Sequence, residues 1–205
     1  MTSADVAVGA DGVARCWWCG DDPLYVDYHD REWGVPLRDE RALFELLCLE
    51  GFQSGLSWIT ILRKREAFRE AFEDFAPSVV AGFDEPEVER LLANPGIVRH
   101  RGKITATIGN ARALGTMHEA GTSLVQVVWS HAPLARPAAP TSRADLPAAT
   151  PESVAIAKAL KTWGMRFVGA TTVYAFMQSA GLVDDHLEGC HRSGIGAEQR
   201  RRTAR

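Results

Sequence analysis

The sequence predicts an all-α fold made of one domain. Two observations support this. Apolar residues recur at helical spacing along much of the chain, and the periodic segments are bounded by glycine, proline or a capping side chain. At 205 residues, with 46% hydrophobic and 24% charged side chains, the chain can bury one good core, and no second domain is needed.

The first predicted elements follow a short extension. Residues 1–14 are small and polar without a period, so we expect a disordered segment, and the fold then begins at Arg15. Asp39 caps a helix whose apolar positions follow helical spacing until Gly51. A second helix is expected over residues 56–72.

Two further helices are predicted in the middle of the chain. A short one follows Asp84, with a proline in its first turn, and the Asn-Pro-Gly run at residues 94–96 ends it. Ile104, Ile108 and Ala111 mark the next helix by their spacing.

The C-terminal third alternates between loop and helix. Residues 131–150 are rich in proline and alanine and lack a period, which is typical of a surface loop. Thr150 then caps a helix that has Pro151 in its first position and ends at Gly164. Residues 169–180 form the last predicted helix.

A very short connection with glycine at both ends joins these last two helices, Gly164-Met165-Arg166-Phe167-Val168-Gly169. Such a turn presents free backbone N–H groups and a helix N-terminus, both of which attract phosphate oxygens. It is the pattern of a helix-hairpin-helix motif, which makes Gly164, Arg166 and Gly169 candidate DNA-binding residues. An ordinary glycine-capped helical hairpin would have the same sequence.

The charge distribution is uneven. A net charge of −3 and a pI near 6.1 argue against a protein that coats nucleic acid. The basic residues nevertheless gather in three groups: Arg63-Lys64-Arg65; Arg99, Arg101, Lys103 and Arg112; and Arg200, Arg201, Arg202 and Arg205. A local positive face suits an enzyme that contacts a few phosphates, although each group alone could simply solvate a helix face. The last group lies in residues 192–205, where we expect a basic disordered tail.

Targeting signals and cysteine content indicate the cellular compartment of the protein. No apolar run approaches the roughly 20 residues that cross a bilayer, and the first 30 residues resemble no secretory leader, so we expect a cytosolic protein with no membrane partner. The four cysteines are too few and too scattered for a disulfide scaffold. They are therefore thiols or metal ligands.

Two sets of residues could bind a metal. Cys16 and His29 near one end, with His186 and Cys190 near the other, would form a closed tetrahedral Cys2His2 zinc site that joins the two ends of the domain. The competing set is the Cys16-x-x-Cys19 pair with His191 as a further ligand. Buried cysteines and satisfied core histidines would give the same sequence, so the residues alone leave the choice open.

One acid stands out in an apolar run. Glu50 directly precedes Gly51, at a predicted helix end where the dipole disfavours a carboxylate by roughly 0.3–1 kcal/mol. An acid placed against its local preference is either solvated at a frayed end or held for a task. Aromatic residues gather in the same N-terminal part of the chain: Trp17, Trp18, Tyr25, Tyr28, Trp33 and Trp58. They pack in a core or line a pocket.

Several runs together carry a resemblance to a known family. They are Arg15-Cys16, Asp22-Pro23-Leu24-Tyr25, Tyr28-His29-Asp30, Glu32-Trp33-Gly34-Val35-Pro36, Leu49-Glu50-Gly51, residues 55–60, residues 96–104, residues 109–112, Phe167-Val168-Gly169, Phe176-Met177-Gln178, Asp185-His186 and Gly189-Cys190. Over roughly residues 15–191, apart from the Pro/Ala loop, the chain resembles the constitutive 3-methyladenine DNA glycosylase I family of the helix-hairpin-helix superfamily.

The resemblance implies a fold, a metal and a set of site residues. It implies a helix-hairpin-helix DNA glycosylase fold for one domain over residues 15–191, with one structural Zn²⁺ per chain clasping the N- and C-terminal segments. The family's zinc ligands match Cys16, His29, His186 and Cys190, with Cys19 and His191 beside them as alternatives. Its pocket acid matches Glu50, its pocket aromatics match Tyr28 and Trp58, and Tyr25 and Trp33 match positions of less defined role.

The implied activity is hydrolysis of the N-glycosidic bond of 3-methyladenine in double-stranded DNA by a monomer. Because methylation at N3 makes the base cationic, selectivity requires an extruded nucleotide, aromatic faces and an acceptor for the exocyclic amine. Tyr28, Trp58 and Glu50 supply these groups, and we expect Glu50 to be ionised when it receives the base. Water is the expected nucleophile, without a lyase step, since no lysine follows Lys161.

Three alternatives remain at this stage. Asp184 either places a charge near the sugar, as an Asp does in other glycosylases of the superfamily, or orients the segment that carries His186. The protein could also be a lesion-binding module without turnover, or a zinc hydrolase with an open coordination position. The residue that wedges into the duplex is expected within residues 53–56.

Overall fold

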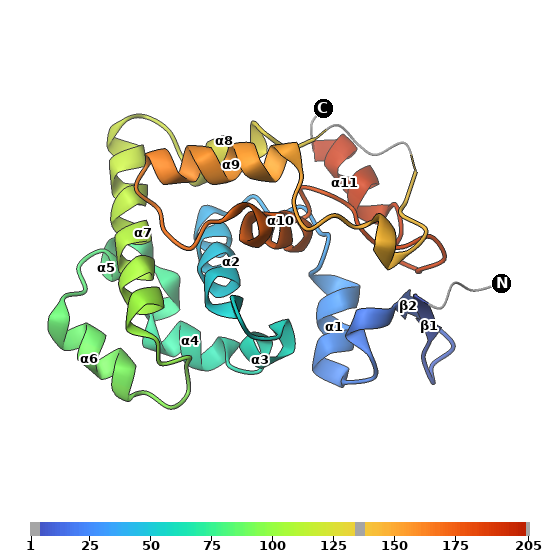
Figure 1. Cartoon of the computed structure of the whole chain (residues 1–205), viewed down its shortest axis with the longest axis horizontal. Helices are drawn as coiled ribbons and strands as arrows, with labels where there is room; N and C mark the ends of the chain where they lie inside the picture. Colours follow the sequence, from blue (N-terminus) through green and yellow to red (C-terminus); the bar gives the residue numbers. More distant parts are fainter. Residues whose placement is uncertain (1–4, 134–137, 204–205) are drawn as a thin grey trace.

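The computed structural model describes residues 5–133 and 138–203. Two strands come first, β1 (Val6–Val8) and β2 (Ala14–Cys16), followed by a 3₁₀ turn over Trp17–Cys19. The helices are α1 (Pro23–Arg31), α2 (Glu40–Gln53), α3 (Trp58–Leu62), α4 (Arg65–Ala71), α5 (Pro77–Val80), α6 (Glu85–Ala93), α7 (Arg101–Glu119), α8 (Leu124–Trp129), α9 (Pro151–Thr162), α10 (Ala170–Ser179) and α11 (Ile195–Thr203). The predicted helical character is confirmed, with the two strands as the exception (Figure 1).

The N-terminal strands correct the expectation of disorder over residues 1–14. β1 pairs with β2 in antiparallel register, with Val6 opposite Cys16. Arg15 holds this hairpin through ion pairs at 2.8 Å to Asp11 and to Asp30 on α1. The sequence did not reveal the strands, because a two-stranded ribbon is stable only through the partners it packs against. Residues 1–4 lie outside the described part.

The single helix expected over residues 56–72 is wrong. Two short helices, α3 and α4, occupy this range and meet at Lys64. Leu62 and Phe68 are both buried, and a spacing of six residues cannot bring two side chains to the same face of one continuous helix. The break between α3 and α4 lets the apolar faces of both helices turn toward the core. The helix capped by Asp39 also continues two residues past the expected end at Gly51, to Gln53.

Other helix boundaries follow the predicted signals. The Asp39 side chain accepts a hydrogen bond from the Ala42 N–H, and the Thr150 side chain accepts one from the Ser153 N–H, as N-caps do. Pro151 is the first residue of α9, and Gly164 follows its end with a φ of +84°. The Pro/Ala loop contains a 3₁₀ turn over Arg143–Asp145, and its residues 134–137 lie outside the described part.

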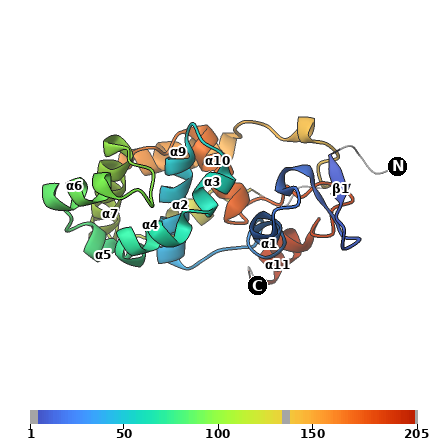
Figure 2. The same cartoon turned by 90° about the horizontal axis from the view of Figure 1, so that it is seen from below.

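The core is continuous and α2 lies near its centre. This helix contacts α3, α7, α8 and α10, and Figures 1 and 2 show it surrounded by the other helices. A group of phenylalanines forms the most deeply buried part of the core: Phe44, Phe52, Phe68, Phe72 and Phe75. Because α2 is enclosed, Glu50 near its C-terminal end is buried as well.

The expected disordered tail also contains structure. Residues 195–203 form α11, and the Ala197 N–H donates a 3.1 Å hydrogen bond to Asp184. The segment after α10 returns to the N-terminal strands, so both ends of the described chain lie on the same side of the molecule (Figure 1). Within the described ranges no helix is both long enough and apolar enough to cross a bilayer.

Candidate active site

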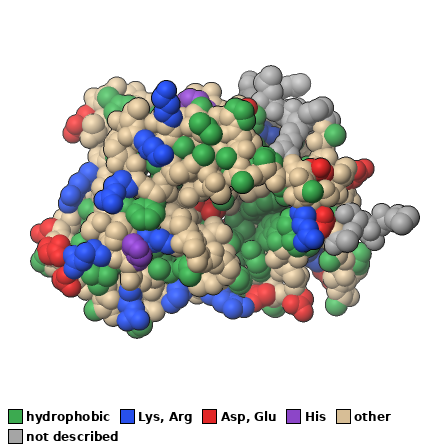
Figure 3. Space-filling view, viewed as in Figure 1, with side chains coloured by type: hydrophobic (Ala, Val, Ile, Leu, Met, Phe, Trp, Pro, Cys, Tyr) green, Lys and Arg blue, Asp and Glu red, His purple; other side chains and the backbone are tan. Residues whose placement is uncertain are grey.

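A pocket of about 500 Å³ opens between α1, α2, α3 and the end of α10. Its lining residues are Trp17, Trp18, Tyr25, Tyr28, Trp33, Glu50, Gln53, Trp58, Arg143, Leu146, Pro147, Ala175, Gln178 and Ser179. Figure 3 shows it as a hollow lined by hydrophobic side chains, with Lys and Arg side chains spread over the same face beside it. This volume lies within the range of pockets that bind small molecules.

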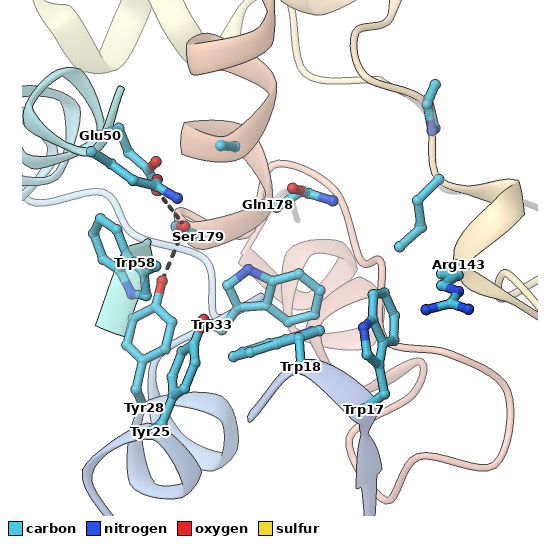
Figure 4. Close-up of a pocket in the computed structure, with 14 residues that line it drawn as sticks. Trp17, Trp18, Tyr25, Tyr28, Trp33, Glu50, Trp58, Arg143, Gln178 and Ser179 are labelled. Atoms are coloured by element: carbon cyan, nitrogen blue, oxygen red, sulfur yellow. Dashed lines mark hydrogen bonds between the residues drawn. The ribbon is translucent and has the colours of Figure 1, made fainter. Parts of the chain in front are cut away.

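Three hydrogen-bonded side chains from three helices line the pocket. Tyr28 on α1 donates a 3.0 Å hydrogen bond to the Ser179 hydroxyl at the end of α10. Ser179 in turn donates a 2.8 Å bond to Oε1 of Glu50 on α2. Figure 4 shows this relay at one side of the pocket. It fixes the Glu50 carboxyl group in one orientation.

The second oxygen of Glu50 is left for a ligand. The residue is 3% exposed, and its Oε2 has no hydrogen-bond partner among the described residues. Burial raises the pKa of Glu50 to about 8, although the Ser179 hydrogen bond offsets part of the shift. A buried polar atom without a partner is costly in a protein interior unless a bound molecule completes it.

Aromatic rings form the walls. The ring centroids of Tyr28 and Trp58 are 5.5 Å apart, and those of Trp18 and Trp33 are 5.0 Å apart. The Nε1 group of Trp58 is buried and has no acceptor within the described chain. Burial raises the pKa of Tyr28 well above its usual value, so its hydroxyl stays neutral and acts as a donor to Ser179. Ring faces in this arrangement attract a flat cation.

The pocket brings together Glu50 and the aromatic residues that the sequence singled out, but Asp184 does not line it. Glu50, Tyr28, Trp58, Tyr25 and Trp33 all line it. Sequence reasoning missed Ser179, since a serine in a helical run carries no signal of its own. It also gave no role to Gln178, nor to Arg143, which reaches the pocket from the loop predicted as a plain connection.

A second constellation of buried polar residues lies beside the pocket. The ligand atoms of Cys16, His29, His186 and Cys190 all lie within 4.8 Å of one another. Cys190 Sγ is 3.5 Å from His29 Nε2 and 3.6 Å from His186 Nδ1, and Cys16 Sγ is 3.8 Å from His186 Nδ1. Zinc bonded to sulfur at about 2.3 Å and to nitrogen at about 2.0–2.1 Å in a tetrahedron would hold S and N about 3.6 Å apart. The cluster can therefore hold a metal ion without rearranging.

The remaining polar groups of this cluster are also satisfied. His29 Nδ1 lies 2.8 Å from the Asp30 carboxylate, and His186 Nε2 lies 3.1 Å from the Trp33 carbonyl oxygen. Metal-binding histidines are usually oriented in this way. Contact with the Cys16 thiol and with both imidazoles lowers the pKa of the Cys190 thiol, which favours the thiolate.

The alternative ligands lie outside this cluster. Cys19 is buried, but its thiol donates to the Cys16 carbonyl oxygen at 3.2 Å. His191 Nε2 faces Asp30 at 3.4 Å, and its Nδ1 faces the Ala14 carbonyl oxygen at 3.0 Å. Asp184 accepts from the backbone N–H groups of His186 and Ala197 at 3.4 and 3.1 Å. These contacts join Asp184 to the segment that carries His186 and to the start of α11.

The predicted hairpin residues lie on the connection between α9 and α10. Gly164 takes a positive φ, Arg166 is exposed, and Gly169 is the N-cap residue of α10. The basic groups of the sequence are only partly available for a ligand. Arg65 and Arg101 form ion pairs with glutamates, and Arg112 donates to the carbonyl oxygens of Ala81 and Phe83.

Comparison with known proteins gives consistent matches. A family model described as methyladenine glycosylase matches residues 18–193. The chain is 52% identical over 181 residues to DNA-3-methyladenine glycosylase 1 of Escherichia coli (strain K12), covering 87% of this chain and 96% of that protein. A crystal structure of 3-methyladenine DNA glycosylase I, also 52% identical, superposes with a TM-score of 0.84 over 87% of this chain and 99% of the other. A variant of a 3-methyladenine DNA glycosylase I solved in complex with 3-methyladenine is 38% identical, with a TM-score of 0.81 over 86% and 96% of the two chains.

Proposed function

The chain belongs to the methyladenine glycosylase family, and from this premise we propose that it removes 3-methyladenine from alkylated DNA by hydrolysing the N-glycosidic bond. The reaction is the first step of base-excision repair. The observation that carries the proposal is the buried carboxyl group of Glu50, whose unpartnered oxygen lies in a pocket walled by aromatic rings.

The chemistry of the lesion fits this pocket. In DNA, methylation at N3 gives adenine a positive charge, so the ring is attracted to the faces of Tyr28 and Trp58. Oε2 of Glu50 is the acceptor for the exocyclic amine. A cation within about 4–6 Å of a carboxylate lowers the pKa of the acid, so the incoming base favours the ionised form of Glu50. Neutral adenine lacks this attraction and is bound less well.

Bond cleavage needs little acid catalysis. The bond between the sugar C1′ and the base nitrogen breaks with its electron pair going to the base, which leaves neutral. Water then adds to C1′ and loses a proton to solvent. Among the described residues that line the pocket none is a lysine, so we expect no Schiff base and no lyase step.

Access to the pocket requires that the nucleotide leave the duplex. We propose that the protein acts as a monomer on double-stranded DNA, and that the turn at residues 53–56 enters the gap left by the base. Leu56 in this turn is 44% exposed, and Gln53 lines the pocket. The helix-hairpin-helix segment holds the phosphates with the backbone around Gly164 and Gly169, while Arg166, Lys158 and Lys161 present exposed charge nearby.

We further propose that the metal is one structural Zn²⁺ bound by Cys16, His29, His186 and Cys190. The donor set and its spacing fit a closed tetrahedral site. The zinc would supply a cross-link between the N-terminal strands and the segment after α10, and with four protein ligands it would leave no open position for a catalytic water.

The test of the proposal is release of free base from methylated duplex DNA by the wild type and by Glu50→Gln, with bound zinc measured in both. We expect 3-methyladenine release by the wild type and a loss of about 100-fold in the variant at unchanged zinc, because a hydrogen bond to a charged acceptor contributes about 1.5–3 kcal/mol. No release by folded, zinc-loaded wild type would instead identify a lesion-binding module. A chain with three protein ligands and an exchangeable water would favour a zinc hydrolase.

A further inference from the structure

Helix α7 contacts both of the turns that bind DNA in the proposed function. One is the connection between α2 and α3, beside the pocket, and the other is the hairpin between α9 and α10. Figure 1 shows the α9–α10 connection passing between α7 and α2. Two side chains of α7, Lys103 and Asn110, bond the backbones of these turns. They are seven residues apart, so they lie on one face of the helix, two turns from each other.

Lys103 fixes the turn beside the pocket. Its Nζ donates to the carbonyl oxygens of Phe52 and Ser54 at 2.8 and 2.6 Å, and the residue is only 7% exposed. These carbonyls belong to the end of α2, where helix carbonyl groups lack partners within the helix and a positive charge is favoured. Burial lowers the pKa of Lys103, which the charge-assisted bonds must offset. The same turn carries the exposed Leu56 two residues further on.

Asn110 fixes the hairpin. Its Oδ1 accepts from the Arg166 N–H at 2.8 Å, and its Nδ2 donates to the Arg166 carbonyl oxygen at 3.1 Å. The next residue, Phe167, has a φ of +57°, a costly conformation for a side chain of this size that persists only when neighbours enforce it. The hairpin also touches α2 directly, since a Cβ placed on Gly51 would lie 3.3 Å from Cβ of Phe167.

On the basis of the proposed function, we propose that Lys103 and Asn110 are positioning residues through which α7 sets the spacing between the turn at residues 53–56 and the hairpin at residues 164–169. The turn that enters the duplex must stay in register with the hairpin that holds the phosphate backbone, or the flipped base does not reach the pocket. Because each residue holds a different turn, its loss has a different kinetic effect. Lys103 governs the flipping step and therefore kcat, whereas Asn110 governs the grip on DNA and therefore KM.

The experiment compares Lys103→Met and Asn110→Ala with a matched control, Thr107→Val. Thr107 is buried on the same face of α7 between the two positions, but its hydroxyl donates within the helix, to the Lys103 carbonyl oxygen at 3.1 Å. For each variant the measurements are the melting temperature, kcat and KM for 3-methyladenine release from alkylated duplex DNA, and the Kd for free 3-methyladenine from the quenching of tryptophan fluorescence.

We expect Lys103→Met to lower kcat about tenfold and Asn110→Ala to raise KM about tenfold, with the free-base Kd of both within about twofold of wild type. Lys103→Arg keeps the positive charge and can still donate to both carbonyl oxygens, so it should recover most of kcat. A purely structural role is indicated, and the inference overturned, if Thr107→Val loses as much activity at the same melting temperature, or if free-base affinity falls in parallel with the rate. No release by the wild type would overturn the proposed function and this inference together.

Discussion

The base pocket and the Cys/His cluster lie side by side. Within the described residues, some buried polar atoms lack partners in the pocket, whereas those of the cluster have them. Tyr28 and His29 are neighbours on α1, and one faces the pocket while the other faces the cluster. In the pocket, Oε2 of Glu50 and Nε1 of Trp58 are buried without partners among the described residues. In the cluster, each histidine has one ring nitrogen beside a thiol and the other on an oxygen atom.

This difference indicates that the pocket serves to bind a ligand, whereas the cluster serves to stabilise the fold. Unpaired buried polar atoms cost free energy in the unliganded protein, which is acceptable only where a ligand later pairs them. In the cluster, the histidine nitrogens that face away from the thiols already have oxygen partners, so these residues are held in place to fix the segments that carry them. Trp33 connects the two regions, since its ring lines the pocket and its carbonyl oxygen faces His186. The cluster therefore also supports one wall of the pocket.

The largest expected effect comes from breaking the cluster. Cys190→Ser should lose the metal and lower the free energy of unfolding by several kcal/mol, which for a chain of this size corresponds to a fall in melting temperature of about 10 °C or more. The physical reason is that the proposed metal cross-link between the N-terminal strands and the segment after α10 would be lost. Metal content by emission spectrometry and a thermal melt measure the two losses.

Cys19→Ser is the matched control for that prediction. It makes the same chemical change at a buried cysteine whose thiol bonds carbonyl oxygens outside the cluster. We expect it to retain a full complement of metal. Metal loss in Cys19→Ser with retention in Cys190→Ser would assign the site to the alternative ligand set.

The next effect concerns the free energy of unfolding of the protein as a function of pH, through the acid in the pocket. Burial raises the pKa of Glu50 from 4.5 to about 8, so the folded protein holds a proton that the unfolded chain releases. The stability contributed by this proton is fully present below about pH 4.5 and is lost as the pH rises to about 8. Glu50→Gln cannot ionise, so its free energy of unfolding should exceed that of the wild type by an amount that grows across this window, to a few kcal/mol.

Chemical denaturation of both proteins at several pH values measures this difference. Glu45→Gln is a useful comparison, because Glu45 lies on the same helix but is paired with Arg69 at 2.8 Å. Burial also raises the pKa of Glu45, but the ion pair with Arg69 offsets part of the rise, so Glu45→Gln should gain less stability than Glu50→Gln across the same pH window. A wild-type advantage over Glu50→Gln that increases with pH would contradict the raised pKa.

The comparison also explains which parts of the molecule were predictable from sequence. Capping and glycine signals located α2, α9 and the hairpin, because those effects act within a few residues of the chain. The break at Lys64 and the pairing of β1 with β2 depend on which faces the core covers, so local patterns missed both. The Pro/Ala loop has no periodic signal, and its contribution of Arg143 to the pocket arises only from tertiary packing.

The site residues likewise differ in how far the sequence could predict them. Glu50 was conspicuous because it contradicts its local environment, whereas the residues alone left the choice between the two Cys/His sets open. Ser179 gave no signal, since its importance lies in the hydrogen bonds at 3.0 and 2.8 Å that connect residues 151 and 129 positions away. Residues that act by connecting distant elements are invisible until those elements are placed in space.

The smallest expected effect comes from Ser179→Ala, which removes the connection while keeping the acid. The Ser179 hydrogen bond lowers the pKa of Glu50, so without it that pKa rises further above about 8 and less of the carboxyl is ionised at neutral pH. We expect base release to fall about 3- to 10-fold at pH 7, in line with about 1 kcal/mol for one hydrogen bond, and to recover as the pH increases. Tyr28→Phe keeps the bond from Ser179 to Glu50 and should leave the midpoint of the pH profile in place. An equal loss at every pH in Ser179→Ala would mean that the hydroxyl shapes the pocket without tuning the acid.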